Sequence, residues 1–141
     1  MKMFYIILIA IVGVSVCLVI GFSDEDVAED IREVVFENLR ATQVEDMDAM
    51  LATVHSESPN YAQTEKLAAM LFENYDLSYE VLLFRYIEQD GEYAIVRLKY
   101  SAQKLAGAEF NDNNIDTVHV FREENGEWKI WSMAILEIEY I

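Results

Sequence analysis

Residues 117–135 read TVHVFREENGEWKIWSMAI, a pattern typical of two antiparallel strands joined by a tight turn. Asn125 and Gly126 stand near its centre, and both residue types accept the positive φ that a two-residue hairpin requires. β-branched and aromatic side chains dominate on either side of them. We therefore predict a strand over residues 116–123 and a final strand over residues 128–141.

Another hairpin is predicted earlier in the chain, before residue 116. Residues 79–89 and 92–103 are again rich in β-branched and aromatic residues, and the dipeptide Asp90-Gly91 separates them. Every other side chain of the second run is apolar, and we expect this set to face the helices: Ala94, Val96, Leu98 and Tyr100. The two hairpins together predict at least four antiparallel strands.

Before residue 76 the apolar residues follow a helical period. Ser23 and the three acidic residues after it are typical of a helix start, and we expect this helix to run to about Arg40. Its apolar stripe consists of Val27, Ile31, Val34, Val35 and Leu39. The sequence thus places a long amphipathic helix at the beginning of the acidic part of the chain.

Two shorter helices are predicted next. One follows Asp46 and carries Met47, Met50, Leu51 and Val54 on one side. Pro59 lies in the break after it. The other starts at Thr64 and Glu65, with an apolar side made of Leu67, Met70, Leu71 and Tyr75. Three helices followed by an antiparallel sheet indicate an α+β fold.

Twenty uncharged residues, 3–22, follow Met1 and Lys2. As a helix they would extend about 30 Å, the thickness of a bilayer core, whereas the apolar region of a cleaved signal is usually about 7–15 residues long. We therefore expect a signal-anchor over residues 1–23, and a membrane-tethered domain over residues 24–141. Because Lys2 precedes the apolar run, the domain is expected on the extracytoplasmic side, periplasmic or extracellular.

A cleaved signal peptide is the alternative. The small residues Gly21 and Ser23 permit cleavage after Ser23, which would make residues 24–141 a secreted protein. In either case the chain is exported. The single cysteine, Cys17, lies inside the apolar run and cannot form a disulfide framework within the chain.

The chain is strongly acidic, with 26 Asp and Glu against 10 Lys and Arg and a net charge of −16. Because a phosphate backbone would be repelled by this net charge at long range, we expect no nucleic-acid partner. The spacing of Asp112, Asn114, Asp116 and Glu123 is similar to that of a calcium loop, but Thr117 stands where the sharp turn requires glycine. We interpret this segment as a solvated turn and expect no metal and no cofactor.

Two segments and the order of the elements carry a family resemblance. They are VEDMDAMLATVHSES at residues 44–58, and the hairpin quoted above, in which NGEWKI leads into the last strand. With these, residues 24–141 resemble the nuclear-transport-factor-2-like superfamily, also called SnoaL-like or cystatin-like. The resemblance implies a cone-shaped barrel, in which three helices pack on a curved antiparallel sheet around a pocket. It also implies dimerisation through the sheet, but it indicates no single activity, because the superfamily includes both enzymes and binding modules.

His119 is the leading candidate for a polar pocket residue. If Thr117 and Phe121 point inward with it, His119 lies near Tyr100 or Trp131; in the other register it lies on the outer face or at a dimer contact. His119 and Tyr100 are the candidate acid–base residues. The candidates for lining an apolar pocket are Tyr61, Tyr86, Tyr100, His119 and Trp131. Aromatic residues at strand spacing are also typical of an ordinary core.

Three other polar residues have less specific interpretations. We expect His55 at the surface near the end of the second helix. Arg97 and Lys99 share the outer face of one strand, where they are expected to pair with carboxylates, although they are also suited to an acidic ligand.

Three functions fit these residues. The first is a membrane-tethered or exported, non-catalytic binding or dimerisation module with an apolar pocket, which the absence of an obvious acid–base pair favours. The second is an isomerase- or cyclase-like enzyme that acts on a small apolar carbonyl compound. The third is an acidic accessory protein that docks on a basic partner at the membrane surface.

Overall fold

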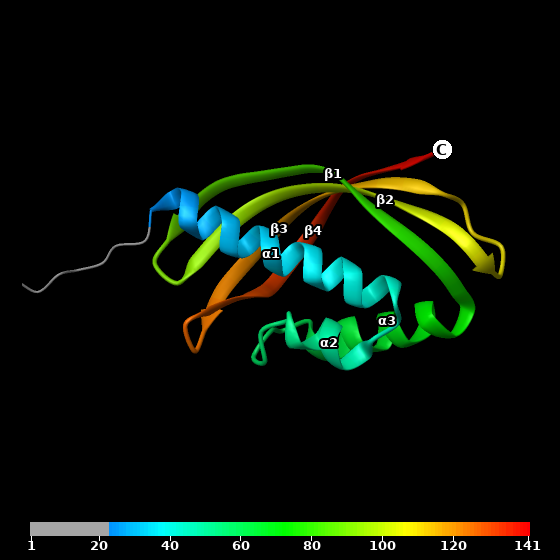
Figure 1. The fold of residues 1–141 in the computed structure, drawn as a ribbon, viewed down its shortest axis with the longest axis horizontal. Coiled ribbons are helices and arrows are strands. Elements are labelled where there is room, and N and C mark those ends of the chain that lie inside the picture. The colour runs from blue at the N-terminus through cyan, green and yellow to red at the C-terminus, as the bar shows by residue number, and fades with distance from the viewer. Residues whose placement is uncertain (1–22) are drawn as a thin grey trace, which may run out of the picture.

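Three helices lie against one face of a four-stranded antiparallel sheet (Figure 1). The computed structural model describes residues 23–141. In chain order the elements are α1 (Asp24–Gln43), α2 (Met47–Ala52), α3 (Tyr61–Asn74), β1 (Tyr75–Asp90), β2 (Tyr93–Gly107), β3 (Asn113–Glu124) and β4 (Glu127–Tyr140). The strands lie in the order β1-β2-β3-β4, so each strand pairs with its neighbours in sequence. The predicted α+β class is confirmed.

The sheet curves around the helices and stays open, with β1 and β4 at its two edges (Figure 1). The predicted closure into a cone-shaped barrel is therefore not found. Four strands are too few to enclose a core by themselves, since closed barrels with a filled interior have about eight. The helices instead cover the concave side of the sheet.

The helix α1 begins with a reciprocal cap. The Ser23 hydroxyl accepts a hydrogen bond from the Asp26 amide (3.3 Å), and the Asp26 carboxylate accepts one from the Ser23 amide (3.1 Å). Val27, Ile31 and Val35 are buried against the sheet, as the apolar stripe predicted. The helix ends at Gln43, three residues beyond the predicted end.

The chain after α2 pairs with β4. Asp46 caps α2 by accepting a hydrogen bond from the Ala49 amide (3.0 Å). Beyond the helix, the His55 amide donates to the Ile130 carbonyl and the Ile130 amide donates to the Thr53 carbonyl, both at 2.9 Å. This pairing draws His55 into the interior, where it is 4% exposed. The expectation of a surface histidine is wrong, because it considered only the end of the helix and not the strand beside it.

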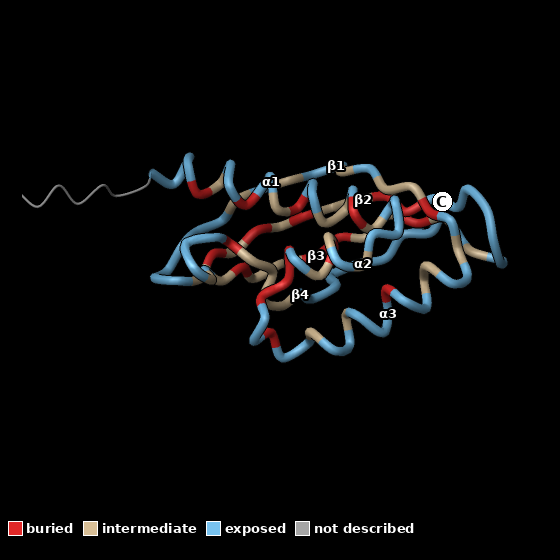
Figure 2. The backbone as a smooth tube through the Cα atoms, turned by 60° about the horizontal axis from the view of Figure 1, so that its bottom comes forward, coloured by how far each residue is buried: buried red, intermediate tan, exposed pale blue. Residues whose placement is uncertain are grey.

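The helix α3 is the least buried of the three helices, as Figure 2 shows. It begins at Tyr61, before the predicted start, and only Ala68 is buried. Leu67 and Met70, placed on the apolar side by their spacing, are 48% and 44% exposed, and Tyr75 already belongs to β1. The helix contacts α2 and β1, and Leu67 and Leu71 of its apolar side line the cavity described below.

The strands β2 and β3 supply the sheet's half of the core. Val96 and Leu98 are buried, as predicted, and they pair in register with His119 and Thr117. Thr117 and Phe121 are fully buried, so β3 has the register in which His119 points toward the helices. The hairpin turns contain the expected residues with positive φ: Gly91 (59°), Asn125 (52°) and Gly126 (81°).

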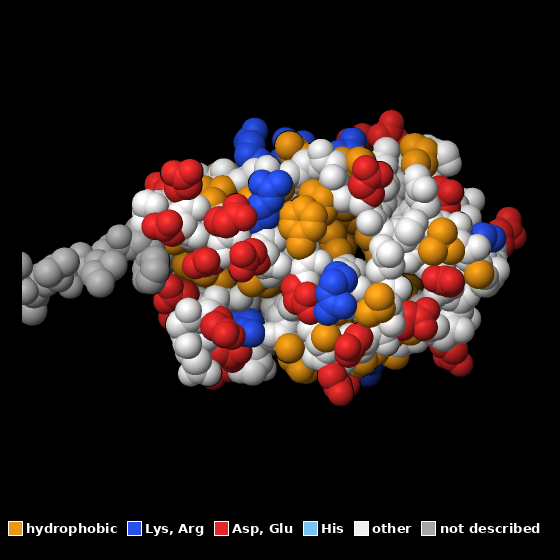
Figure 3. Space-filling view, in the orientation of Figure 1, with side chains coloured by type: hydrophobic (Ala, Val, Ile, Leu, Met, Phe, Trp, Pro, Cys, Tyr) orange, Lys and Arg blue, Asp and Glu red, His pale blue; other side chains and the backbone are white. Residues whose placement is uncertain are grey.

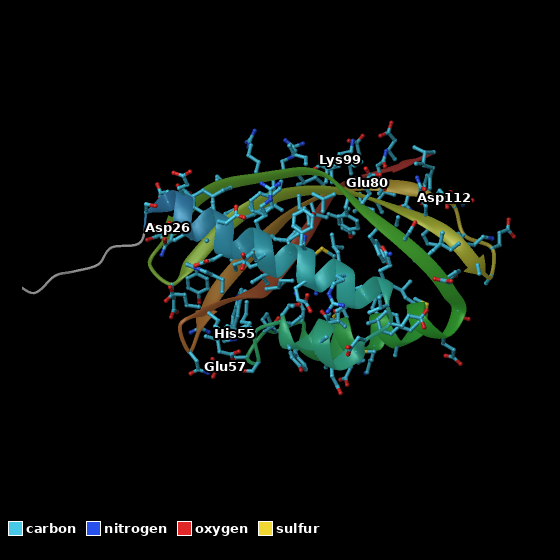
Figure 4. All side chains as sticks on the ribbon, in the orientation of Figure 1. Asp26, His55, Glu57, Glu80, Lys99 and Asp112 are labelled. Carbon is cyan, nitrogen blue, oxygen red and sulfur yellow. The ribbon has the colours of Figure 1, made fainter. Side chains whose placement is uncertain are left out.

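The outer face of the sheet carries ion pairs. Arg97 donates two hydrogen bonds to the Asp116 carboxylate, at 3.0 and 2.6 Å. Lys99, which points away from the helices in Figure 4, lies 3.6 Å from Glu139. The expected pairing of these two basic residues with carboxylates is confirmed.

No helix within residues 23–141 is long and apolar enough to cross a membrane. The signal-anchor or signal peptide predicted at residues 1–23 lies, apart from Ser23, outside the described residues.

Candidate ligand-binding cavity

A cavity of about 190 Å³ lies between the helices and the concave face of the sheet. The helices contribute apolar side chains that include Val35, Leu39, Met50 and Leu71. The sheet contributes Leu98, Tyr100, His119, Ile130 and Met133. For comparison, an apolar cavity of about 150 Å³ in another protein binds benzene. This cavity therefore has room for a molecule of about one ring.

His119 is the residue of the sheet wall whose polar atoms are buried without a partner. Both of its ring nitrogens are buried, and neither has a hydrogen-bond partner among the described residues. Its ring stacks near that of Phe121, with centroids 6.2 Å apart. Burial lowers the pKa of His119 to about 4. The imidazole is therefore neutral at pH 7 and has one donor and one acceptor nitrogen.

Tyr100, from β2, lines the same cavity. Burial raises the pKa of its hydroxyl. The ring of Tyr79 lies 6.3 Å away, and burial, followed by the proximity of Tyr100, raises the pKa of Tyr79 to about 12. Both phenols stay protonated at neutral pH. The structure thus brings the two candidate acid–base residues to one cavity, each in its neutral form.

The other three residues proposed for the pocket are distributed differently. Trp131 lines the cavity, and its indole also contacts His55, Tyr93 and Arg122. Tyr61 packs against the small cluster of α2 and α3, and Tyr86 packs against the main core. Neither of these two tyrosines lines the cavity. The structure therefore places Tyr100, His119 and Trp131 at the cavity, and Tyr61 and Tyr86 away from it.

Several polar residues of the helical wall were missed from sequence. Asn38 donates to the Thr53 hydroxyl (2.8 Å), and the Thr42 hydroxyl donates to the Asn38 carbonyl (2.7 Å). Ser58 donates to the carbonyl of Trp131 (2.7 Å). The first two could have been found, because residues 38 and 42 are one helical turn apart and flank Leu39 in the apolar stripe of α1. Their donors are used within the protein, in contrast to the nitrogens of His119.

The cavity wall has an unusual electrostatic character for so acidic a chain. None of the described residues that line it is Asp, Glu, Lys or Arg. The part of the chain that the structure describes also contains no group of three His, Cys, Asp or Glu residues able to hold a metal. The wall therefore provides apolar contact and one unpaired neutral imidazole, and it does not provide the pair of carboxyls that acid–base catalysis commonly uses.

A second, wider hollow of about 530 Å³ lies between α1, α2 and the β3–β4 turn. Its wall carries Asp30, Glu33 and Glu37 from α1, and Glu127 and Lys129 from β4. Lys129 lies 3.0 Å from Glu127 and donates to the Ala52 carbonyl. Acidic side chains are also spread over the face seen in Figure 3. This hollow is therefore negatively charged.

The fold is that of the nuclear-transport-factor-2-like superfamily, as solved structures show. They include the β subunit of benzoate 1,2-dioxygenase from Burkholderia mallei, with 13% identity over 82% of this chain and 90% of that chain and a TM-score of 0.64. An NTF2-like protein of unknown function from Pseudomonas putida has 12% identity, 82% and 88% coverage and a TM-score of 0.66. A protein of unknown function with a cystatin-like fold from Nostoc punctiforme has 13% identity, 84% and 95% coverage and a TM-score of 0.67. At these identities the likeness shows the fold alone.

The sequence gives a more specific assignment. Residues 33–141 match the family described as the C-terminal domain of anti-sigma-I factor RsgI9, and the chain belongs to this family. No curated protein matches the sequence.

Proposed function

We propose that this chain is a non-catalytic binding module that takes a small, mostly apolar molecule into the cavity between its helices and its sheet. Its family is named after an anti-sigma-I factor. We propose that binding of the small molecule regulates an anti-sigma factor of this kind. The uncharged residues 3–22 support tethering of the domain to a membrane, on its extracytoplasmic side.

The observation that carries this function is the chemistry of the cavity wall. The wall is mostly apolar, and none of the described side chains in it is charged, so it favours the transfer of an apolar molecule out of water. Proton transfer accelerates a reaction best when the pKa of the transferring group lies near the working pH. The pKa of His119, at about 4, lies well below neutral pH. The wall is therefore suited to binding rather than to turnover.

The test uses the purified full chain and toluene as an apolar probe. We expect toluene to raise the midpoint of thermal unfolding, because a ligand that binds only the folded state stabilises it. Ala68→Leu should abolish this rise, because Ala68 is buried in the cavity wall and a larger side chain fills the space. Ala69→Leu is the matched control, since Ala69 follows Ala68 in α3 but is exposed and does not belong to the cavity wall. A toluene effect that survives Ala68→Leu would contradict the proposal.

An enzyme remains the second candidate, because His119 and Tyr100 share the cavity. A neutral histidine can accept a proton and a neutral tyrosine can donate one. If the chain turns over an apolar carbonyl compound, His119→Gln should abolish that turnover without removing toluene binding. Turnover that is unchanged in His119→Gln would exclude this pair as the catalytic residues.

Docking on a basic partner has its own support in the acidic hollow beside α1. Such an interaction should weaken sharply between about 50 and 500 mM salt, since exposed charges are screened over a few ångströms at high ionic strength. Glu33→Lys in the hollow should weaken it further, whereas Glu73→Lys, in α3 and outside the hollow, should not. A partner whose binding does not change with salt would contradict this mode.

We further propose a homodimer through the outer face of the sheet. On that face β1 and β2 present three basic residues, Arg85, Arg97 and Lys99, and β1 also presents Glu80 and Glu88; β3 and β4 present Asp116, Glu137 and Glu139. A two-fold axis parallel to the strands would place the three basic residues of one copy over β3 and β4 of the other. Val118 and Val120, which alternate with the inward residues of β3, would lie at the centre of this contact.

A further inference from the structure

The two nitrogens of His119 form the most conspicuous unsatisfied polar site in the described part of the chain. Four buried side-chain polar atoms there have no hydrogen-bond partner, and two of them are Nδ1 and Nε2 of this one ring. The other two, Oη of Tyr86 and Oδ1 of Asn113, belong to residues that do not line the cavity. Buried polar groups nearly always have partners, so a group from outside the protein is expected at His119.

The charge of that group follows from the surroundings of His119. The imidazole is neutral at pH 7, and within residues 23–141 no Lys or Arg lines the cavity to hold an anion. No Asp or Glu in the part of the chain that the structure describes lines it to hold a cation. Burying an unpaired charge in such a site is strongly unfavourable. The occupant is therefore neutral.

The size of the occupant follows from the cavity, which at about 190 Å³ accepts about one ring. Its functional group follows from the imidazole. A neutral imidazole has one N–H donor and one acceptor nitrogen, and a hydroxyl group can accept from the first or donate to the second. A hydrocarbon of the same size would leave both nitrogens unpaired.

We propose that the cavity binds a neutral single-ring alcohol or phenol whose hydroxyl hydrogen-bonds to a ring nitrogen of His119. This inference rests on the proposed binding function and adds the chemical class of the ligand. Neither nitrogen is exposed at the cavity surface, so the hydroxyl reaches it by displacing a neighbour. Met133 pairs with His119 in register and lines the cavity, and its unbranched side chain adapts readily to such a displacement.

The experiment compares three para-substituted probes on the full chain by calorimetry: toluene, p-cresol and 4-methylbenzoate. We expect p-cresol to bind roughly three- to tenfold more tightly than toluene, the ratio that one net hydrogen bond provides. We expect 4-methylbenzoate, an anion at pH 7, not to bind. His119→Phe should remove the preference for p-cresol and keep toluene binding, because it retains a ring but has no nitrogens.

His55→Phe is the matched control, because His55 is the chain's other histidine and does not line the cavity. It should leave the preference for p-cresol unchanged. The imidazole nitrogen resonances of the wild-type chain provide a readout that does not depend on the folding of a variant. We expect p-cresol, and not toluene, to shift those of His119.

The outcomes separate the two proposals. If neither toluene nor p-cresol binds, the proposed binding function fails. If both bind equally and the His119 resonances do not move with p-cresol, the cavity binds apolar molecules and the inference about the hydroxyl is overturned. Tighter binding of 4-methylbenzoate than of p-cresol would overturn the assignment of a neutral ligand.

Discussion

The imidazole of His55 meets the indole of Trp131 edge-on, with ring centroids 5.0 Å apart and ring planes at 88°. His55 follows α2 and Trp131 lies in β4, so this contact fixes the helical layer to the edge of the sheet. The Nδ1 atom of His55 also accepts a hydrogen bond from the Glu57 amide (3.1 Å). The His55 side chain therefore makes an aromatic contact with β4 and also stabilises the turn that follows it.

Two substitutions of His55 should destabilise the fold to different degrees. His55→Phe keeps a ring against Trp131 and loses the acceptor for the Glu57 amide. His55→Ala loses both, and we expect a decrease of about 2 kcal/mol in the free energy of unfolding, with His55→Phe between it and the wild type. Urea unfolding of the three proteins measures the order. Equal midpoints for His55→Ala and the wild type would show that the contact does not stabilise the fold.

Burial of His119 makes the stability depend on pH. Its pKa is about 4 in the folded state against 6.5 for the free side chain, so the unfolded state takes up the proton first as the pH falls. The free energy of unfolding should therefore decrease between about pH 6.5 and 4, by an amount on the order of 3 kcal/mol, and not change further below that range through this group. Above pH 6.5 the residue is neutral in both states and has no effect.

His119→Phe should remove that decrease. The carboxylates titrate in both proteins, so the difference in stability between wild type and variant, followed from pH 7 to pH 4.5 by urea unfolding, isolates the histidine. An identical pH dependence in the two proteins would mean that His119 is not buried in its neutral form.

Two glycines should differ in their response to alanine. Gly126 has a φ of 81° and open space around an added Cβ, so Gly126→Ala should cost about 1 kcal/mol through backbone strain alone. Gly107 has a φ of 103°, and an added Cβ would lie 3.0 Å from the Cα of Tyr75 and closer still to the carbonyl oxygen of Asn74. Gly107→Ala should therefore destabilise the fold more than Gly126→Ala, as thermal unfolding of both variants can measure. The reverse order would contradict the close approach of β2 to the start of β1.

The proposed dimer should depend on the centre of the outer sheet face. Val120→Glu should convert the dimer to a monomer, because it would bury an unpaired carboxylate at the apolar centre of the contact. Val44→Glu is the control, since Val44 is 58% exposed at the end of α1, which lies on the concave side of the sheet and not on its outer face. Light scattering during size-exclusion chromatography measures the mass. A wild-type chain that is monomeric at tens of micromolar would exclude the dimer.

Local chemistry in the sequence was enough to predict the elements whose ends depend on neighbouring residues. Ser23 and Asp26 form the expected cap of α1, three residues apart. Asn125 and Gly126 adopt the expected positive φ in the last turn. The alternation in β2 correctly indicated its buried face, because side chains of a strand alternate whatever it packs against.

The α+β class, the two hairpins and the amphipathic face of α1 were predictable from the sequence, because each depends on interactions a few residues apart. The burial of His55, the exposure of Leu67 on α3 and the orientation of His119 toward the cavity became clear from the three-dimensional structure. These outcomes depend on contacts between segments far apart in the chain, such as Thr53 and His55 with Ile130. The period of a sequence shows which residues share a face, but which partner covers that face is settled by packing.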